Sequence, residues 1–227
     1  MRKNKILTVF LSTFLLTGCT KDRFKQPFEI PTLSDNTALS EMFDVNKWMS
    51  ANSIRKLYAP WDGLSDNSTF KCFFSSDYFY FRFEVKDDTP TLCSDYRNEL
   101  NVSNEDRVEI FFSPDKNMTQ TYYGAEMDPN GNTLDYSCNY YRKFNYDWNF
   151  NTLDLKTQKD ADAYVLIGRI EIKELEKLGV NLNAFYMGVF RADYYGREQV
   201  HWYSAQKTDD KEADFHKPNV LFEAKKK

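Results

Sequence analysis

The chain has 227 residues, of which 34 are acidic and 30 are basic, so its formal net charge at pH 7 is −4. An acidic balance argues against binding to nucleic acid or to an anionic membrane surface, because both would repel the protein. The length suits one all-β domain, and 19 Phe and 15 Tyr residues are enough for a substantial core with aromatic side chains left for the surface.

Residues 1–18 are predicted to be an export signal. Three basic residues stand within the first five positions, and residues 6–16 form an apolar stretch too short to span a bilayer as a mature helix. The run LTGC at positions 16–19 resembles the signal of a bacterial lipoprotein. Cleavage before Cys19 would leave a diacylated N-terminus, firmly anchored by two acyl chains. An ordinary secretory signal with a chance cysteine is the alternative.

A signal of this kind predicts a protein that is lipid-anchored in the outer membrane or on the cell surface of a Gram-negative bacterium. Residues 19–37 are interpreted as the lipidated cysteine and a tether, since they carry mixed charges and two prolines without a sustained period. Lys21 and Asp22 resemble the short charged signals that send some lipoproteins to the surface. Residues 38–224 then form the folded domain.

The domain is predicted to consist of short strands. Residues 39–53 favour a helical turn or two, residues 174–178 another that Gly179 ends, and residues 140–150 a loop lying over a sheet. Strands are expected near 69–75, 78–87, 107–113, 119–127, 133–138, 163–173, 184–193, 201–204 and 219–223. About nine strands with little helix predict an antiparallel β-sandwich of immunoglobulin or jelly-roll type.

The stretch NEDRVEIFFSP at 104–114 places charged and apolar residues in alternation. Val108 and Ile110 fall on one side of the expected strand, whereas Arg107 and Glu109 fall on the other. Such an acidic strand can bind a hydroxyl-rich ligand or a hard cation. It can equally be the solvated edge of a sheet.

Three cysteines remain after Cys19, an odd number that cannot form a complete disulfide framework. Cys72 and Cys93 are a conceivable pair, although free buried thiols are an equally good interpretation. Two histidines and the absence of a CxxC spacing exclude a His-rich metal site and give no sign of zinc.

The order of several motifs resembles the family 9 carbohydrate-binding module, including its occurrence in surface lipoproteins of Bacteroidetes. The matching pieces, spread over about residues 48–224, are Pro60-Trp61, YFYFRFEVKD at 78–87, EDRVEIFF at 105–112, YGAEMDPNG at 123–131 with Asp135, residues 164–171, FRAD at 190–193, and DFHKP at 214–218 with Leu221-Phe222. The resemblance implies a β-sandwich that binds sugar without catalysis.

In sugar-binding members of that family two tryptophans clamp a sugar ring. Ser103 or Val102 stands at the first of these positions in this sequence, and Phe215 stands at the second. The resemblance also implies that Glu109 and Glu126 supply polar contacts. It further implies structural calcium, for which Asp87, Asp88 and Asp106 are candidates because calcium takes hard oxygen ligands.

The candidate ligand-binding residues are Glu109, Glu126, Arg191, Trp61, Tyr123, Trp202 and Phe215, with Trp148 and Tyr195 as further possible aromatic platforms. Arg191 is expected to pair with Glu109, to donate hydrogen bonds to a sugar, or to form a structural salt bridge. Because a buried carboxylate needs a partner, Glu109 is expected to be paired or to face a ligand.

These observations predict a non-catalytic lipoprotein that holds a polysaccharide or oligosaccharide near a glycoside hydrolase or a glycan importer, in carbohydrate catabolism. One alternative is a structural or protein-interaction lipoprotein that kept the sandwich and lost the sugar site. Another is a glycoside hydrolase, which would need two carboxylates at a set separation. Nucleic acid is not an expected partner.

Overall fold

The structure is a computed structural model that describes residues 23–34, 37–94, 96–195 and 199–227. The predicted export signal and the Cys19 lipidation site lie outside these residues. Within the described ranges, no helix has the length and apolar character needed to cross a membrane. The first strand, β1 (Phe28–Ile30), begins only a few residues into the described part of the chain.

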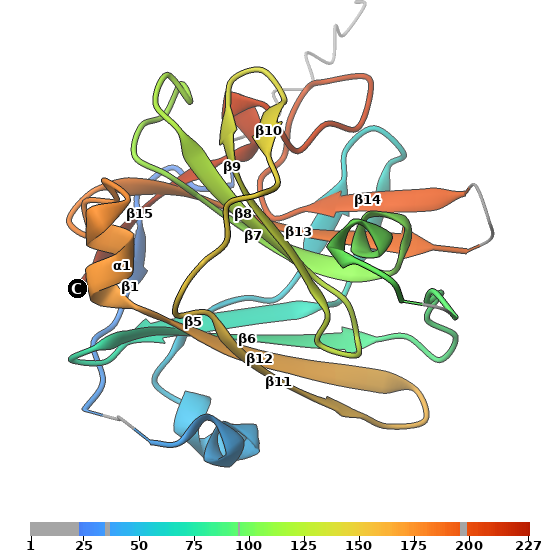
Figure 1. Ribbon diagram of the computed structural model, residues 1–227, viewed down its shortest axis with the longest axis horizontal. Helices are drawn as coiled ribbons and strands as arrows, with labels where there is room; N and C mark the ends of the chain where they lie inside the picture. The colour runs from blue at the N-terminus through green and yellow to red at the C-terminus, as the bar shows by residue number, and fades with distance from the viewer. Residues whose placement is uncertain (1–22, 35–36, 95, 196–198) are drawn as a thin grey trace, which may run out of the picture.

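Two stacked sheets form the molecule, and Figure 1 shows them as an upper and a lower layer. The lower sheet has five strands in the order β11-β12-β6-β5-β2, and every neighbouring pair is antiparallel. These strands are β2 (Asn52–Ile54), β5 (Thr69–Phe74), β6 (Tyr78–Lys86), β11 (Asp154–Lys159) and β12 (Ala163–Glu171).

The upper sheet has ten strands, eight of them in the order β10-β9-β8-β7-β13-β14-β3-β4. Their bounds are β3 (Leu57–Ala59), β4 (Leu64–Asp66), β7 (Arg107–Ser113), β8 (Tyr122–Met127), β9 (Thr133–Asn139), β10 (Lys143–Asn145), β13 (Phe185–Tyr194) and β14 (Val200–Ser204). The remaining two strands are β15 (Phe222–Lys226), which pairs antiparallel with β13, and β1, which pairs parallel with β15.

The main core lies between the two sheets. Alternation along β6 directs Phe79, Phe81, Phe83 and Val85 into it, as the period-2 pattern predicts. The inward side chains of β7, which include Val108 and Ile110, meet them from the other sheet. Both sheets are therefore held by one continuous apolar layer.

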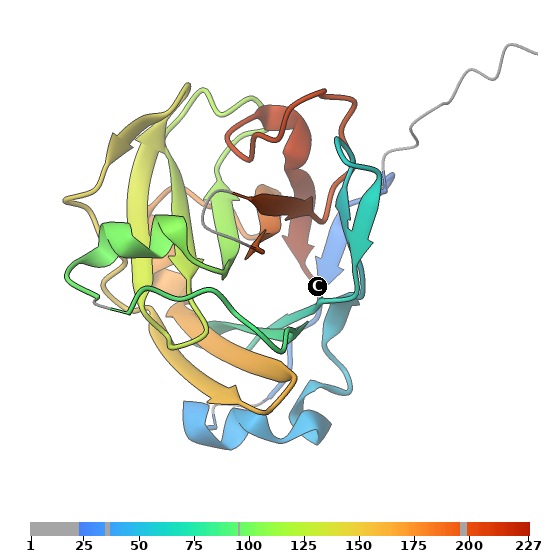
Figure 2. The same cartoon turned by 90° about the vertical axis from the view of Figure 1, so that its right-hand side faces the viewer.

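The outer face of each sheet is covered as well. On the five-stranded sheet, the short helices η1 (Leu39–Phe43) and η2 (Val45–Trp48) bury Trp48 against Phe73 and Tyr80, and Figure 2 shows them outside that sheet. On the ten-stranded sheet, η3 (Glu99–Asn104) and the segment before and including η4 (Pro218–Val220) cover a second apolar cluster around Phe111 and Phe190. The charged side chains of β7 are consequently enclosed.

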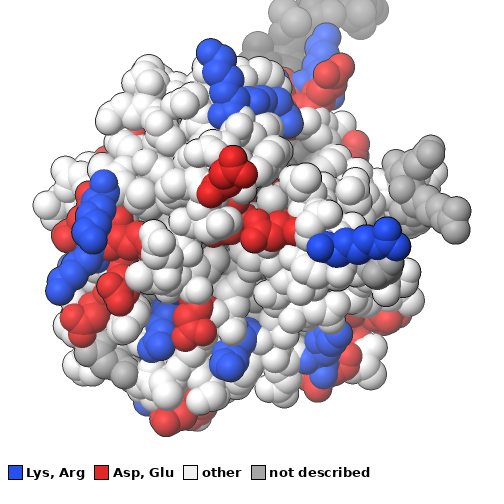
Figure 3. All heavy atoms as spheres, viewed as in Figure 1, with Lys and Arg blue, Asp and Glu red and all other residues white. Residues whose placement is uncertain are grey.

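Charge is distributed without a large field of one sign on the face that Figure 3 shows, where basic and acidic side chains are interspersed. The helix α1 (Ile172–Lys177) follows β12 directly and is closed by Gly179 at φ +83°, a conformation that favours glycine. This bears out the predicted helical turn at 174–178.

Several expectations need correction. The sandwich is all-β as predicted, but the described residues form fifteen strands instead of about nine. β7 lies in the middle of its sheet with both faces buried, so it is not a solvated edge. The tether predicted up to residue 37 contributes β1, and the loop predicted at 140–150 contains β10. Cys72 and Cys93 do not form a disulfide, and the alternative interpretation of reduced thiols is confirmed.

Candidate functional site

A buried ion cluster on the outer face of β7 forms the centre of the site. The Nε of Arg107 donates a 2.9 Å hydrogen bond to Oε1 of Glu109, two residues further along the same strand face. The same nitrogen lies 2.7 Å from Oε2 of Glu126, which stands directly opposite Glu109 in the β7–β8 register. Both glutamates and the arginine are at most 6% exposed. One guanidinium therefore joins two carboxylates in a nearly dry environment.

Local structure around the cluster holds the Arg107 guanidinium in place. The side chain of Asn98 caps η3 by accepting the N–H of Leu100. This short helix directs the carbonyl oxygen of Ser103 to Nη1 of Arg107 at 3.1 Å, and the carbonyl of Glu105 accepts from the same nitrogen at 3.2 Å. The guanidinium also lies over the Trp202 ring, 5.3 Å from its centroid, a cation–π arrangement.

A turn and a glycine position β8, the second strand that contributes a residue to the cluster. Asp128 accepts the N–H groups of Asn130 and Asn132, and this turn leads β8 into β9. At Gly124 a Cβ atom would lie 2.8 Å from the Tyr136 ring, so only glycine leaves room for that ring. The Tyr136 hydroxyl can then donate a 3.0 Å hydrogen bond to Oε1 of Glu126.

Electrostatics in the cluster favour a proton on Glu109. Burial first, and then the charge of Glu126, raise the pKa of Glu109 to about 8, although Arg107 opposes the shift. Burial alone would lower the pKa of Arg107, but the charges of Glu126 and Glu109 raise it above its usual value, so the guanidinium stays charged. The cluster has one positive charge for two carboxyl groups.

A hollow of about 190 Å³ opens above the cluster. Glu109, Glu126 and Arg107 form part of its lining, together with Ser103, Leu134, Arg142, Phe144, Tyr146, Trp202, Ala213, Asp214, Phe215 and His216. Phe144 and Tyr146 stack at 5.1 Å with an interplanar angle of 10°, and Tyr146 remains 43% exposed. The hollow thus combines charged groups with an accessible aromatic ring face.

Phe215 and Trp202 do not form a parallel clamp for a sugar ring. Their rings meet edge to face at 5.4 Å and 80°, and Phe215 stacks on Phe190 at 4.3 Å. One face of Trp202 is already covered by Arg107. Tyr146 is therefore the best stacking platform in the hollow.

The rim of the hollow is tied together by Asp214. Its carboxylate accepts hydrogen bonds from the Tyr141 hydroxyl, from Nη2 of Arg142 at 2.9 Å and from the His216 backbone at 3.0 Å. His216 lies behind it with Nδ1 2.9 Å from the Tyr122 hydroxyl. Burial first, and then the charge of Arg142, lower the pKa of His216 to about 3, so it is neutral at physiological pH.

Four of the seven predicted ligand residues meet at this hollow: Glu109, Glu126, Trp202 and Phe215. The other three lie elsewhere. Tyr123 packs on Trp148 at 4.9 Å beside the main core, and the Trp61 ring is 6.3 Å from Phe215 without lining the hollow. Of the alternatives for Arg191, pairing with Glu109 is wrong, because Arg107 takes that place. The structural salt bridge is confirmed.

Sequence reasoning missed Arg107, Arg142, Phe144 and Tyr146 as site residues. Arg107 could have been found from its spacing, since residues i and i+2 of a strand share a face. Phe144 and Tyr146 show the same spacing within a segment that was interpreted as a loop. Arg142 gave no comparable signal.

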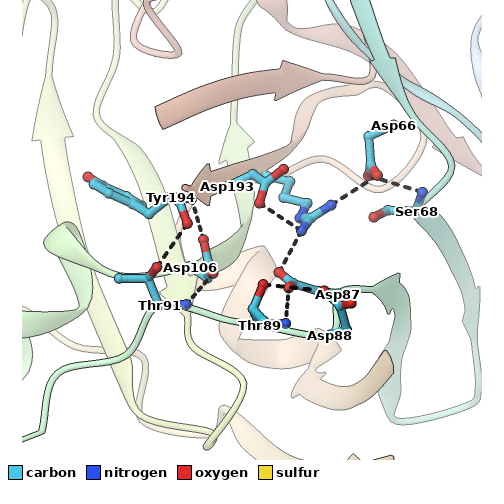
Figure 4. A network of polar contacts seen from close by, with 10 residues as sticks. Asp66, Ser68, Asp87, Asp88, Thr89, Thr91, Asp106, Asp193 and Tyr194 are labelled. Atoms are coloured by element: carbon cyan, nitrogen blue, oxygen red, sulfur yellow. Dashed lines mark hydrogen bonds and ion pairs between the residues drawn. The ribbon is translucent and has the colours of Figure 1, made fainter. Parts of the chain in front are cut away.

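Arg191 belongs to a separate acidic cluster at one end of the sandwich, which Figure 4 shows from close by. Its guanidinium pairs with Asp66 at 2.9 Å, Asp87 at 2.8 Å and Asp193 at 3.1 Å. Asp106 lies beside them and accepts the backbone N–H groups of Thr91 and Tyr194. Three carboxylates thus pair with one arginine, and a fourth lies beside them.

Three of these aspartates could hold a metal ion. Ligand atoms of Asp87, Asp106 and Asp193 lie within 4.8 Å of one another. Burial, opposed by two backbone hydrogen bonds, raises the pKa of Asp106 to about 6. The buried hydroxyl of Tyr164 has no hydrogen-bond partner within the described residues and interacts electrostatically with Asp106 and Asp87. A hard cation fits this donor set, which includes two of the three predicted residues.

Comparisons with known proteins give a family and a set of similar folds. The family model described as "Carbohydrate family 9 binding domain-like" matches residues 37–222. No curated protein matches the chain at a significant level. The fold is similar to that of a protein from Bacteroides uniformis ATCC 8492 described as a candidate carbohydrate-binding protein, at 13% identity and a TM-score of 0.70, covering 89% of this chain and 99% of that one.

Two structures of a family 9 carbohydrate-binding module from Caldicellulosiruptor kristjanssonii are also similar, each at 17% identity. The complex with cellotriose has a TM-score of 0.58 and is matched over 89% of this chain and 94% of that one. The complex with glucose has a TM-score of 0.52, with 88% and 95% covered. At these identities the similarity concerns the fold, which is the predicted β-sandwich.

Proposed function

We propose that this chain, which belongs to the carbohydrate family 9 binding domain-like family, binds a polysaccharide or oligosaccharide in the hollow above Arg107, Glu109 and Glu126, without cleaving it. The observation that carries the proposal is the combination, in one hollow, of buried hydrogen-bonding groups and the exposed Tyr146 ring. Carboxylate and guanidinium groups bind hydroxyls, and an aromatic face packs on the C–H face of a sugar.

The cluster geometry does not favour hydrolysis. A glycosidase places its two carboxyl groups on either side of the scissile bond, with the substrate between them. Here the Nε of Arg107 interacts with both Glu109 and Glu126, so the guanidinium takes the space that a substrate would need. Binding is therefore the better interpretation of this pair of carboxylates.

Affinity electrophoresis against a panel of plant and host glycans tests the proposal. We expect one glycan to retard the protein, and we expect Tyr146→Ala to weaken its binding about tenfold, since loss of a central aromatic contact costs on the order of 1–2 kcal/mol. Tyr195→Ala is the matched control, because Tyr195 is an exposed tyrosine outside the hollow. A folded protein that no glycan retards would favour the protein-interaction alternative.

The acidic cluster supports a second proposal, that Asp87, Asp106 and Asp193 hold a structural calcium ion. Calcium would join β13 to the segments that carry Asp87 and Asp106. After EDTA treatment, an excess of CaCl₂ at about 100 times its Kd should raise the free energy of unfolding by about 2.7 kcal/mol. Asp106→Asn should remove this gain, whereas Asp88→Asn should keep it, because Asp88 lies outside the group. Equal melting temperatures in EDTA and calcium would contradict the proposal.

Anchoring is proposed on the strength of the LTGC run alone. A lipid at Cys19 would hold the sandwich at the outer membrane or cell surface, where it would present glycan to hydrolases or importers. Cell fractionation tests this: the protein should partition with membranes, and Cys19→Ala should release it. A wild-type protein found in the aqueous fraction would overturn the anchor and leave the glycan proposal intact.

A further inference from the structure

The charges that line the hollow do not balance. Among the described residues, its lining has three carboxylates, Glu109, Glu126 and Asp214, but only two guanidinium groups, those of Arg107 and Arg142. Arg142 pairs with Asp214 at the rim. Arg107 is left to serve both glutamates on the floor, so the charges there balance only while one of the two carboxyl groups holds a proton.

Glu109 is the carboxyl group that holds this proton, because its pKa is raised to about 8. Glu126 accepts a hydrogen bond from Tyr136 and lies 2.7 Å from Nε of Arg107, whereas Glu109 accepts a hydrogen bond from that same nitrogen. Glu109 is only 1% exposed, so water compensates its charge poorly. The upward shift of its pKa has the same origin, burial and the neighbouring charge of Glu126.

Three features define a ligand that would complete this arrangement. It carries a positive charge for the floor, because a cation with hydrogen-bond donors can take the place of the Glu109 proton and pair with the carboxylate. It has a flat apolar face for Tyr146, because that ring stands exposed at the hollow. It is small, since about 190 Å³ corresponds to roughly six water molecules at ~30 Å³ each.

We infer that the hollow selects an amino sugar with a free ammonium group, which pairs with Glu109 beside Glu126. The inference rests on the proposed glycan-binding function and narrows it. A neutral hexose supplies hydroxyl donors but no charge, and an N-acetylated sugar loses the ammonium group. A uronic acid or sulfated sugar adds a negative charge next to the Glu126 carboxylate and is repelled. The hollow therefore discriminates by charge at one ring position.

Three trisaccharides test this with a single variable. Cellotriose, the trimer of β-1,4-linked glucosamine and its fully N-acetylated form share ring and linkage and differ at the 2-position. The pairs glucosamine and glucose, galactosamine and galactose, and mannosamine and mannose cover other ring configurations. Calorimetry at pH 6 and at pH 7, where the ammonium group is charged, measures each affinity. The affinity for the amino sugar should be higher at pH 7, because its ammonium group replaces the Glu109 proton.

We expect at least one amino sugar to bind about 10-fold or more tightly than its neutral and N-acetylated counterparts, because a hydrogen bond to a charged group contributes that much to affinity. In Glu109→Gln, the affinities for the amino sugar and for its neutral and N-acetylated counterparts should lie within about threefold of each other. Glu176→Gln, which removes an exposed charge on α1, should leave the preference unchanged and so excludes attraction by net charge. Should Glu109→Gln fail to fold, Glu126→Gln tests the same charge balance.

The outcomes distinguish the preference for amino sugars from glycan binding itself. A neutral sugar that binds as tightly as its amino counterpart overturns the amino-sugar inference and leaves glycan binding in place. A preference that survives in both glutamine variants overturns the inference as well. Failure of a folded protein to bind any sugar, in this set or in the glycan panel, overturns the proposed function itself.

Discussion

Replacing Arg107 by methionine is expected to lower the free energy of unfolding by about 3–5 kcal/mol. The substitution leaves Glu109 and Glu126 facing each other across β7 and β8 without their shared cation, and an uncompensated buried charge is costly. At about 2–4 °C per kcal/mol for a chain of this size, the melting temperature should fall by roughly 6–20 °C. Chemical denaturation followed by fluorescence measures the change directly.

The combined variant Arg107→Met, Glu109→Gln, Glu126→Gln should regain most of this loss, because it removes the repelling charges along with the cation. Arg55→Met serves as the matched control, since Arg55 is exposed and its loss should cost less than about 0.5 kcal/mol. If Arg107→Met alone costs less than about 1 kcal/mol, the cluster is not the tightly coupled unit described above.

Raising the pH of the calcium-free protein from 6 to 9 is expected to destabilise it by an amount on the order of 3 kcal/mol. Burial raises the pKa values of three carboxyl groups, Glu105 to about 7, Asp106 to about 6 and Glu109 to about 8. A carboxyl group whose pKa is higher in the folded state favours folding while it is protonated. That contribution is lost as the pH rises through the folded-state pKa.

The opposite slope should appear on the acidic side. His216 has a pKa of about 3 in the folded state, so between about pH 3 and pH 6.5 its proton is bound mainly by the unfolded chain, and this one group adds stability as the pH rises. The three carboxyl groups lose their contribution from the unfolded-state pKa of about 4 upward and outweigh the one histidine, so thermal melts in EDTA should give a maximum near about pH 4. Glu109→Gln should reduce the fall in melting temperature between pH 6 and pH 9. A wild-type melting temperature that is the same at pH 6 and pH 9 would contradict these pKa assignments.

Strands in which apolar and polar residues alternate clearly could be predicted from the sequence, and so could the faces that these strands bury. Alternation placed Phe79 and Phe81 on one side of β6, and it separated Val108 from Glu109 on β7. The register places Glu109 directly opposite Glu126, the two glutamates for which the family resemblance implies polar contacts. These are local properties, since they follow from two residues per repeat and from turns such as the one at Asp128.

The features that were not predicted correctly depend mostly on contacts between segments that are distant in the sequence. β2, β3 and β4 have three residues each, too few to show a period. β7 looked like a solvated edge because its outer side chains are charged, and their burial depends on η3 and β14, which cover them. Arg191 lies 125 residues from its partner Asp66, a pairing that a single sequence cannot reveal.

The parallel pairing of β1 with β15 determines how mechanical force passes through the molecule. Phe24 stacks on Phe222 at 4.1 Å, and β1 lies alongside β15, which in turn is bonded to β13, the direct neighbour of β7. A pull on the chain before Arg23 along the axis of β1 would load its hydrogen bonds together, in shear, instead of opening them one at a time. The load path from that end of the chain to the hollow then consists of four adjacent strands. A ligand under tension would be held by the sheet itself, with the loops at the rim carrying little of the strain.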